Sequence, residues 1–209
     1  MKAGLLKKMA DAYAAFLRPP WQRVRNEFMR RECDWVQIVT FNPSRFDDVY
    51  EPRSCFEFLN MPGDPTGGFL LHPLRHPNGT QRWVRAAKIS DPASNDSADK
   101  VFAEMVRQFE PSILKPLDSK EIKRLLEASM DYWPHIYALC VMAAKAGNKE
   151  AAERYFAAFQ TAMADKQFSW VEPRRQELIA CLNEIGSEGL VTRLAEVQAD
   201  KLRIMKLAA

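Results

Sequence analysis

Cysteine and glycine are scarce in this sequence, and neither is arranged for a familiar chemistry. The four cysteines are scattered, and none belongs to a Cys-x-x-Cys pair, the spacing of many zinc and thiol–disulfide sites. Cys140 and Cys181 fall on apolar faces of expected helices, which favours buried free thiols over disulfides. The glycine-rich residues 62–68 lack the Gly-Lys-Ser/Thr ending of a phosphate-binding loop. We therefore predict no cofactor.

Long apolar runs are also lacking. No stretch approaches the roughly 20 apolar residues that span a membrane. Near the amino terminus, Lys7 and Lys8 are followed by Asp11 and a periodic pattern, whereas a signal peptide continues with an apolar block. We therefore expect a cytoplasmic protein with reduced thiols and no membrane partner.

Charge of one sign is in slight excess only. The chain has 30 Lys and Arg against 27 Asp and Glu, a net charge of +3. Residues 1–90 hold 14 basic and 9 acidic side chains, whereas residues 91–209 hold 16 and 18. Nucleic-acid-binding domains typically carry a basic stripe, so this balance favours an ordinary solvated surface. The 209 residues, 47% of them hydrophobic, are enough for one large or two small domains.

The fold prediction rests on residues 35–41, Trp-Val-Gln-Ile-Val-Thr-Phe. In a strand, both faces of this segment are apolar, with Val39 on one and Ile38 on the other. Such a segment is typical of a central strand covered on two sides, although a buried helix has a similar composition. The turn-forming residues 31–34 and 42–44 favour the strand.

The surrounding pattern predicts an α+β fold with a small antiparallel four-stranded sheet. Pro19-Pro20 ends the first helix, and Asn78-Gly79 is a hairpin-turn dipeptide. Strands joined by short connections predict a meander, and the flanking helices are the nearest candidates to cover its two faces. The predicted bounds are residues 5–17 and 98–110 for the helices, residues 22–30, 35–41, 54–59 and 81–89 for the strands, and residues 42–53 for a polar loop.

From residue 91 the apolar period changes from two to 3.6, which indicates helices to the end of the chain. Asp118 with Glu121 three residues later is a helix start box, and Pro134 occupies a first helical position. The predicted domains are residues 1–117, an α+β domain, and residues 118–209, an array of helical hairpins. The array is either separate or packed as one unit with the first domain.

Two histidines raise the question of a metal site. His72 and His76 have the spacing of a metal-binding pair on a helix, but Pro73 and Pro77 disfavour a helix there. No further His or Cys lies near them in the sequence. Histidines on the surface of a proline-rich loop are the favoured interpretation, and we predict no metal.

Adjacent carboxylates raise the question of acid/base chemistry. Asp47 and Asp48 diverge if they lie in a strand, and in a loop such residues usually cap a turn. We therefore assign no catalytic residue. A small hydrolase that uses Asp47, Asp48, His72 and His76 stays open as an alternative.

Basic and aromatic residues on the predicted outer strands form a candidate binding surface. If those strands are neighbours, their arginines gather on one sheet face, as suits phosphate contacts, base stacking or a protein interface. Interleaved glutamates that neutralise the face are the alternative. The candidate residues are Arg23, Arg25, Arg30, Arg82, Arg85 and Trp83.

Three segments are similar to a family of bacterial proteins: Arg-Asn-Glu-Phe-Met-Arg at residues 25–30, Trp-Val-Gln-Ile-Val-Thr-Phe-Asn-Pro-Ser at residues 35–44, and Phe-Glu-Phe-Leu-Asn-Met at residues 56–61. Their order resembles domain of unknown function family four-three-zero-four, over about the first 120 residues. The chain departs from the family at residues 41–43, where members often carry Gln and Lys. The resemblance implies the α+β order, and no catalytic residues are established for the family to carry over.

Three functional hypotheses follow. The leading one is a non-enzymatic protein that binds another protein, such as an immunity or accessory factor, because the sequence holds no coherent catalytic constellation. The alternatives are the small hydrolase and a weak nucleic-acid binder that acts through the arginines.

Overall fold

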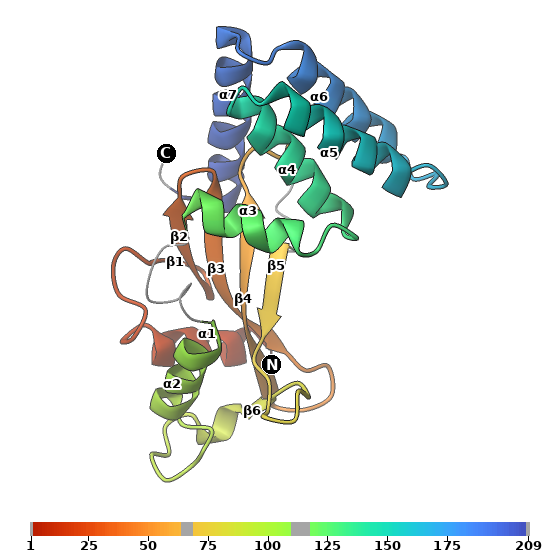
Figure 1. The fold of residues 1–209 in the computed structure, drawn as a ribbon. Coiled ribbons are helices and arrows are strands. Elements are labelled where there is room, and N and C mark those ends of the chain that lie inside the picture. Colours follow the sequence, from red (N-terminus) through yellow and green to blue (C-terminus); the bar gives the residue numbers. More distant parts are fainter. Residues whose placement is uncertain (1, 64–68, 110–117, 208–209) are drawn as a thin grey trace. The chain divides into compact units, whose positions relative to one another are not determined.

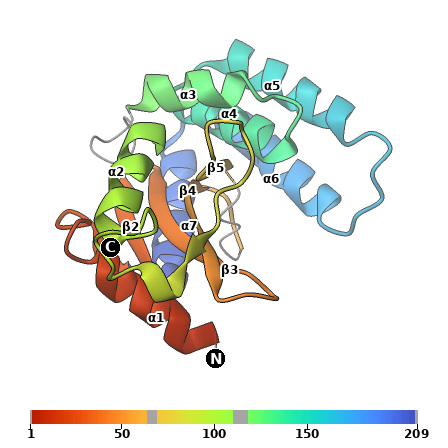
Figure 2. The same ribbon diagram turned by 90° about the horizontal axis from the view of Figure 1, so that it is seen from below.

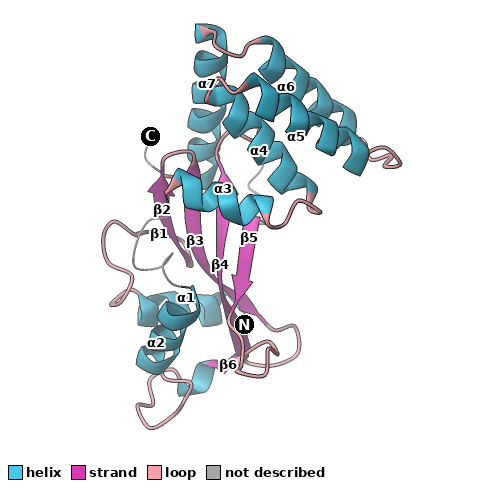
Figure 3. Cartoon of the chain, in the orientation of Figure 1, coloured by secondary structure: helices cyan, strands magenta, loops and turns pink. Residues whose placement is uncertain are grey.

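The computed structural model describes residues 2–63, 69–109 and 118–207, and these divide into two compact units. The first unit comprises Met1–Glu57, Pro65–Leu117 and Met205–Ala208, and the second comprises mainly Phe58–Asp64 and Asp118–Ile204. The first unit contains the sheet, and the helices from residue 119 onward form the body of the second (Figure 3). The chain is therefore α+β, as the sequence predicts.

Within the described residues, the sheet has six strands, and five of them follow one another in the order β1-β2-β3-β4-β5 (Figure 1). The sixth, β6, pairs with β4. Neighbouring strands are antiparallel, with Phe28 opposite Val39 and Val49 opposite Arg85. The predicted meander is thus confirmed. The strands are β1 (Gln22–Val24), β2 (Glu27–Glu32), β3 (Trp35–Pro43), β4 (Val49–Phe58), β5 (Phe69–Pro73) and β6 (Val84–Arg85).

The strand bounds differ from the prediction in three places. The strand predicted over residues 22–30 is a hairpin, because the chain turns where Arg25 adopts a φ of 57°. The loop predicted over residues 42–53 is shorter, since β3 and β4 both extend into it. The strand predicted over residues 81–89 is only β6, followed by a short 3-10 helix, Ala86–Lys88. The hairpin adds one strand, and β5 (Phe69–Pro73), where no strand was predicted, adds another, so the sheet has six strands in the described residues where four were predicted.

Strand β3 is buried on both faces, which confirms the prediction from its composition. Trp35 and Val39 on one face and Val36 and Ile38 on the other are all buried. The polar Gln37 is also buried, and its amide is hydrogen-bonded on both sides, as described below. Burial of each large apolar side chain stabilises the fold by about 1.5–3 kcal/mol.

Two helices cover one face of the sheet, α1 (Lys2–Tyr13) and α2 (Ala98–Phe109). They lie side by side in two views (Figures 1 and 2). Their residues Tyr13 and Met105 belong to one hydrophobic cluster with Val39 and Phe41 of β3. The expectation of one helix on each face is therefore wrong: both pack on the face that carries Val39. The apolar residues of α2 lie along one side of the helix, and that side is buried in the same hydrophobic cluster.

The centre of this core is an aromatic group. The Tyr13 ring stacks on Phe41 at 4.8 Å between centroids, and Tyr50 packs edge-on against Phe41 at 5.9 Å. The two tyrosine hydroxyls hydrogen-bond to each other at 2.9 Å, so each buried oxygen has a partner. Burial raises the pKa of both Tyr13 and Tyr50 above the ordinary tyrosine value.

The second unit contains five helices in its described residues, and their ends coincide with local sequence signals. Asp118 caps α3 by accepting the Glu121 backbone N–H at 2.8 Å, and Asn148 caps α5 by accepting that of Ala151 at 3.0 Å. Pro134 lies in the first turn of α4, as predicted. The helices are α3 (Ser119–Glu127), α4 (Trp133–Lys145), α5 (Lys149–Ala162), α6 (Val171–Asn183) and α7 (Glu188–Met205).

Helix α4 is the buried element of this helical array. It is apolar nearly all round, and most of its side chains are buried. The Cys140 thiol donates to the Ala152 carbonyl of α5 at 3.3 Å, and the Tyr137 hydroxyl donates to Glu177 of α6 at 3.0 Å. Cys140 and Cys181 are buried free thiols, as predicted.

The tyrosine pair gives a test of the first core. Tyr13→Phe leaves the Tyr50 hydroxyl buried without its partner, so we expect a loss of about 1–3 kcal/mol in the free energy of unfolding. The Y13F/Y50F double variant removes both hydroxyls, and we expect it to lose less. Urea denaturation followed by tryptophan fluorescence measures both losses; a double variant less stable than Y13F would contradict the pairing.

The pH dependence has a definite sign. Because the folded-state pKa values are raised, the unfolded state loses these phenolic protons first, at about pH 10. The contribution of the pair is therefore complete below that pH and falls as the pH rises above it. The double variant is expected to show a shallower decline in stability between pH 9 and pH 11 or so.

Candidate functional site

The structure separates the arginines that the sequence singles out. Strand β1 pairs with β2, whereas β6 pairs with β4, so the outer strands are not neighbours. Arg23 and Arg25 lie in the β1–β2 hairpin, where the Arg23 guanidinium donates to Asp11 at 2.7 Å and to the Arg25 carbonyl at 3.0 Å. This pair lies at the surface. The prediction that the six candidate binding residues lie on one sheet face assumed that the outer strands are neighbours, and the strand pairing does not meet that assumption.

Arg30 is buried and serves the sheet itself. Its Nη2 donates to Gln37 Oε1 at 2.7 Å, and Gln37 Nε2 donates to Ser54 Oγ at 3.3 Å. Its Nε lies 2.5 Å from Glu32, and its guanidinium stands over the Trp21 ring. Burial lowers the pKa of Arg30 and raises that of Glu32, since both ions lose water. These contacts form one polar row across β2, β3 and β4.

Arg82 is the second buried arginine, and it joins three segments of the first unit. Its guanidinium forms ion pairs with Glu104 of α2 and with Asp96, the latter at 3.5 Å. Its Nη2 also donates to the Asn95 carbonyl at 2.7 Å. Arg82 therefore fastens α2 and the preceding loop to the segment that leads into β6.

The proposed hydrolase residues do not form a cluster. Asp47 and Asp48 follow β3 in a loop, His72 lies on β5 opposite Ser54, and His76 lies in the turn that contains Gly79. In the part of the chain that the structure describes, no three His, Cys, Asp or Glu side chains gather as they would around a metal ion. Partial burial of its ring lowers the pKa of His72. The hydrolase therefore stays a hypothesis without geometric support.

The loop between β3 and β4 presents the most exposed large apolar side chain in the described structure. Phe46 is 93% exposed. Ser44 Oγ accepts the backbone N–H groups of Phe46 at 3.2 Å and Asp47 at 3.3 Å, and the Ser44 N–H donates to the Val49 carbonyl at 3.0 Å. The loop is thus closed by its own hydrogen bonds, as in Ser/Thr turns. Its conformation holds the phenylalanine in water.

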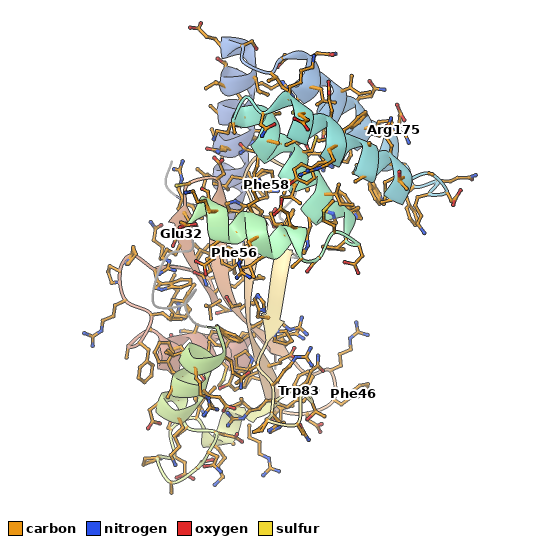
Figure 4. The ribbon with its side chains drawn as sticks, in the orientation of Figure 1. Glu32, Phe46, Phe56, Phe58, Trp83 and Arg175 are labelled. Atoms are coloured by element: carbon orange, nitrogen blue, oxygen red, sulfur yellow. The ribbon has the colours of Figure 1, made fainter. Side chains whose placement is uncertain are left out.

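A second aromatic residue, Trp83, lies beside this loop. The Ala86 N–H donates to the Asp48 carbonyl at 3.0 Å, and Arg85 pairs with Val49, so the β6 segment runs along the base of the loop. Trp83 is 38% exposed at its start, and both rings are at the same end of the sheet (Figure 4). We call these exposed residues the Phe46 surface: Arg45, Phe46, Asp47, Asp48, Trp83 and Arg85.

The Phe46 surface includes two of the predicted binding residues, Trp83 and Arg85. Sequence reasoning missed Phe46, although an aromatic residue within the polar turn Ser-Arg-Phe-Asp-Asp was a usable signal. The surface carries both basic and acidic groups around its rings. That combination is typical of a protein interface, where aromatic anchors lie within a polar rim.

Comparison with known proteins adds no assignment: no family model, no curated protein and no solved structure matches this chain. The resemblance to family four-three-zero-four accordingly stays a prediction. Within the described residues, none of the helices has the length and apolar character needed to cross a bilayer.

The buried arginine Arg82 is expected to act in stability. Arg82→Ala leaves Asp96 without this cation and leaves Glu104 with only the exposed Arg107, at 3.7 Å. Because both carboxylates are largely buried, we expect a loss of about 3–5 kcal/mol in unfolding free energy. Arg23→Ala is the matched control, because it breaks only the surface pair with Asp11, for which the expected loss is below about 1 kcal/mol. Urea denaturation compares the two variants; equal losses would show that Arg82 is not a structural centre.

Proposed function

We propose that this chain is a non-enzymatic protein that binds another protein through the Phe46 surface. The observation that carries the proposal is Phe46 itself, which is 93% exposed on a loop that hydrogen bonds hold in shape. Burying a phenylalanine side chain gains about 1.5–3 kcal/mol. A partner with a matching apolar pocket supplies that gain on binding.

The order of the loop supports the proposal further. An interface residue whose backbone is already fixed loses only side-chain freedom on association, which improves affinity. Ser44 provides that fixation through three hydrogen bonds. Trp83 widens the apolar centre, and aromatic residues and arginine are the types enriched at binding hot spots.

The charged residues around the two aromatic rings indicate which charges the partner's surface carries at the edge of the interface. Arg45, Asp47 and Asp48 flank the anchor Phe46 in the sequence, and the pairing of Arg85 with Val49 brings a second positive charge to the same loop. A partner face with both signs, rather than a polyanion such as nucleic acid, complements this rim. More specifically, we propose that the chain acts as an immunity or accessory protein. We also propose membership of family four-three-zero-four, on residues 25–30, 35–44 and 56–61.

Affinity capture with the full chain from its native host tests the proposal. We expect one partner in stoichiometric amount, and we expect Phe46→Ala to weaken its binding by about tenfold or more, as for a hot-spot residue. Val191→Ala is the matched control, since Val191 is an exposed apolar residue of α7. Calorimetry with the purified partner gives the affinities.

Two results would contradict the proposal. The first is recovery of the wild-type chain alone in repeated captures. The second is equal affinity of F46A and wild type for the recovered partner, which would place the interface elsewhere.

A further inference from the structure

A hollow of about 400 Å³ lies at the surface of the first unit, lined by α1 and by the residues that follow the short 3-10 helix Ala86–Lys88. Helix α1 and this 3-10 helix are in contact and lie side by side (Figure 2). We call the hollow the α1 groove. Its lining includes Gly4, Lys7, Lys8, Asp11, Ile89 and Ser90.

The α1 groove is part of the folded backbone and is partly open because position 4 is a glycine. A side-chain carbon placed at Gly4 would meet no other atom within 4 Å, so free space remains beside the helix. Ile89 is buried beneath the groove, and its carbonyl accepts the Ala98 N–H at 2.9 Å, where α2 begins. The groove is thereby fixed between two helices of the same unit.

The α1 groove carries positive charge that no carboxylate offsets. Within the described residues, neither Lys7 nor Lys8 forms an ion pair. Asp11 is the acidic residue of the lining, and the guanidinium of Arg23 already pairs with it at 2.7 Å. An anion that enters the groove therefore gains two attractive charge interactions, whereas a cation is repelled by the same two lysines.

The rest of the lining combines one polar group with carbon. In the part of the chain that the structure describes, the Ser90 hydroxyl has no hydrogen-bond partner. Ala12, Ile89 and the methylene stems of the lysines supply apolar surface. Sites for small molecules are typically hollows of about 300–1,000 Å³ with such a lining, in which a few polar groups fix the orientation of the ligand.

We propose that the α1 groove binds a small organic anion, in which a phosphate or carboxylate group is attached to an apolar body. The anionic oxygens accept hydrogen bonds from the ammonium groups of Lys7 and Lys8 and from the Ser90 hydroxyl. The apolar body lies in the space beside Gly4. Nucleic acid requires a longer basic stripe than two lysines provide, so the ligand is a small molecule. This site does not depend on the Phe46 surface.

Phenyl phosphate and benzoate are the probes, and benzylamine, which joins a similar ring to a positive charge, is the matched control ligand. In a nuclear magnetic resonance titration of the full chain, we expect phenyl phosphate to shift the backbone amide resonances of Gly4 and Ser90 together and saturably. Added salt is expected to weaken this binding, because the lysines are exposed. Benzylamine is expected to shift neither resonance. The anion that binds more tightly identifies the charged group of the ligand.

Three substitutions test the roles of the lining residues. Lys7→Gln and Lys8→Gln are each expected to weaken phenyl phosphate binding by about two- to fivefold, the range for solvent-exposed ion pairs. Gly4→Leu fills the groove without a clash and is expected to abolish saturable binding. Lys149→Gln is the matched control, because Lys149 is an exposed lysine of the second unit, and it is expected to leave binding unchanged. Circular dichroism establishes that each variant keeps its helices.

The proposal is overturned if neither phenyl phosphate nor benzoate shifts the Gly4 and Ser90 resonances saturably, or if benzylamine shifts them equally. Wild-type affinity in the K7Q/K8Q double variant, or in a folded G4L variant, would overturn it as well. Binding of inorganic phosphate as tight as that of phenyl phosphate would also count against it, because the apolar body would then contribute nothing.

Discussion

Strand β3 constrains the first unit, because both of its faces are buried and it carries a polar residue in the middle. Gln37 is fully buried, and an unsatisfied amide there would cost about 1–3 kcal/mol. The neighbouring strands supply its partners, Arg30 on β2 and Ser54 on β4. The register of three strands is thereby tied to one side chain, since a shift by one residue would turn Gln37 to the other face.

The need to satisfy buried polar groups explains why two of the conspicuous arginines, Arg30 and Arg82, lie inside the first unit rather than at its surface. A guanidinium can satisfy several buried acceptors at once, and it stays charged when buried. Arg30 does so within the sheet, and Arg82 does so between α2 and the loop before it. The residues left for recognition at this end of the sheet are therefore the aromatic ones, Phe46 and Trp83, with charge at their edges.

Local signals made the helical half of the chain predictable. Asp118 and Asn148 cap helices by bonds to residues three positions on, and Pro134 begins one, so a short stretch of sequence contains all the information. The sheet depends on more distant contacts. Nothing local in residues 22–30 requires a turn, because Arg25 adopts its left-handed conformation only to let β1 pair with β2.

Neither the sheet face on which α1 and α2 pack nor the exposure of Phe46 could be predicted from the sequence, and the reasons differ. The apolar pattern of an amphipathic helix predicts that it packs on a sheet, but it does not predict on which face. For α1 the face is set by a tertiary contact, the stacking of Tyr13 on Phe41. Phenylalanine usually indicates burial, so a pattern based on hydrophobicity places Phe46 inside. Its exposure follows from the tight Ser44 turn, in which the side chain points away from both strands.

Exposure of an aromatic ring does not by itself mark a binding surface, since scattered apolar residues are normal on soluble proteins. Phe16 shows the difference: it is 37% exposed, yet it stacks on Phe102 of α2 at 4.9 Å, so its open edge is what remains after packing. Phe46 has no ring contact within the described residues, although a hydrogen bond to Ser44 fixes its backbone. Phe168 is intermediate, because one face stacks on Trp170 and the remainder lies open. The rings that the backbone fixes without covering are the ones that a partner can cover at low entropic cost.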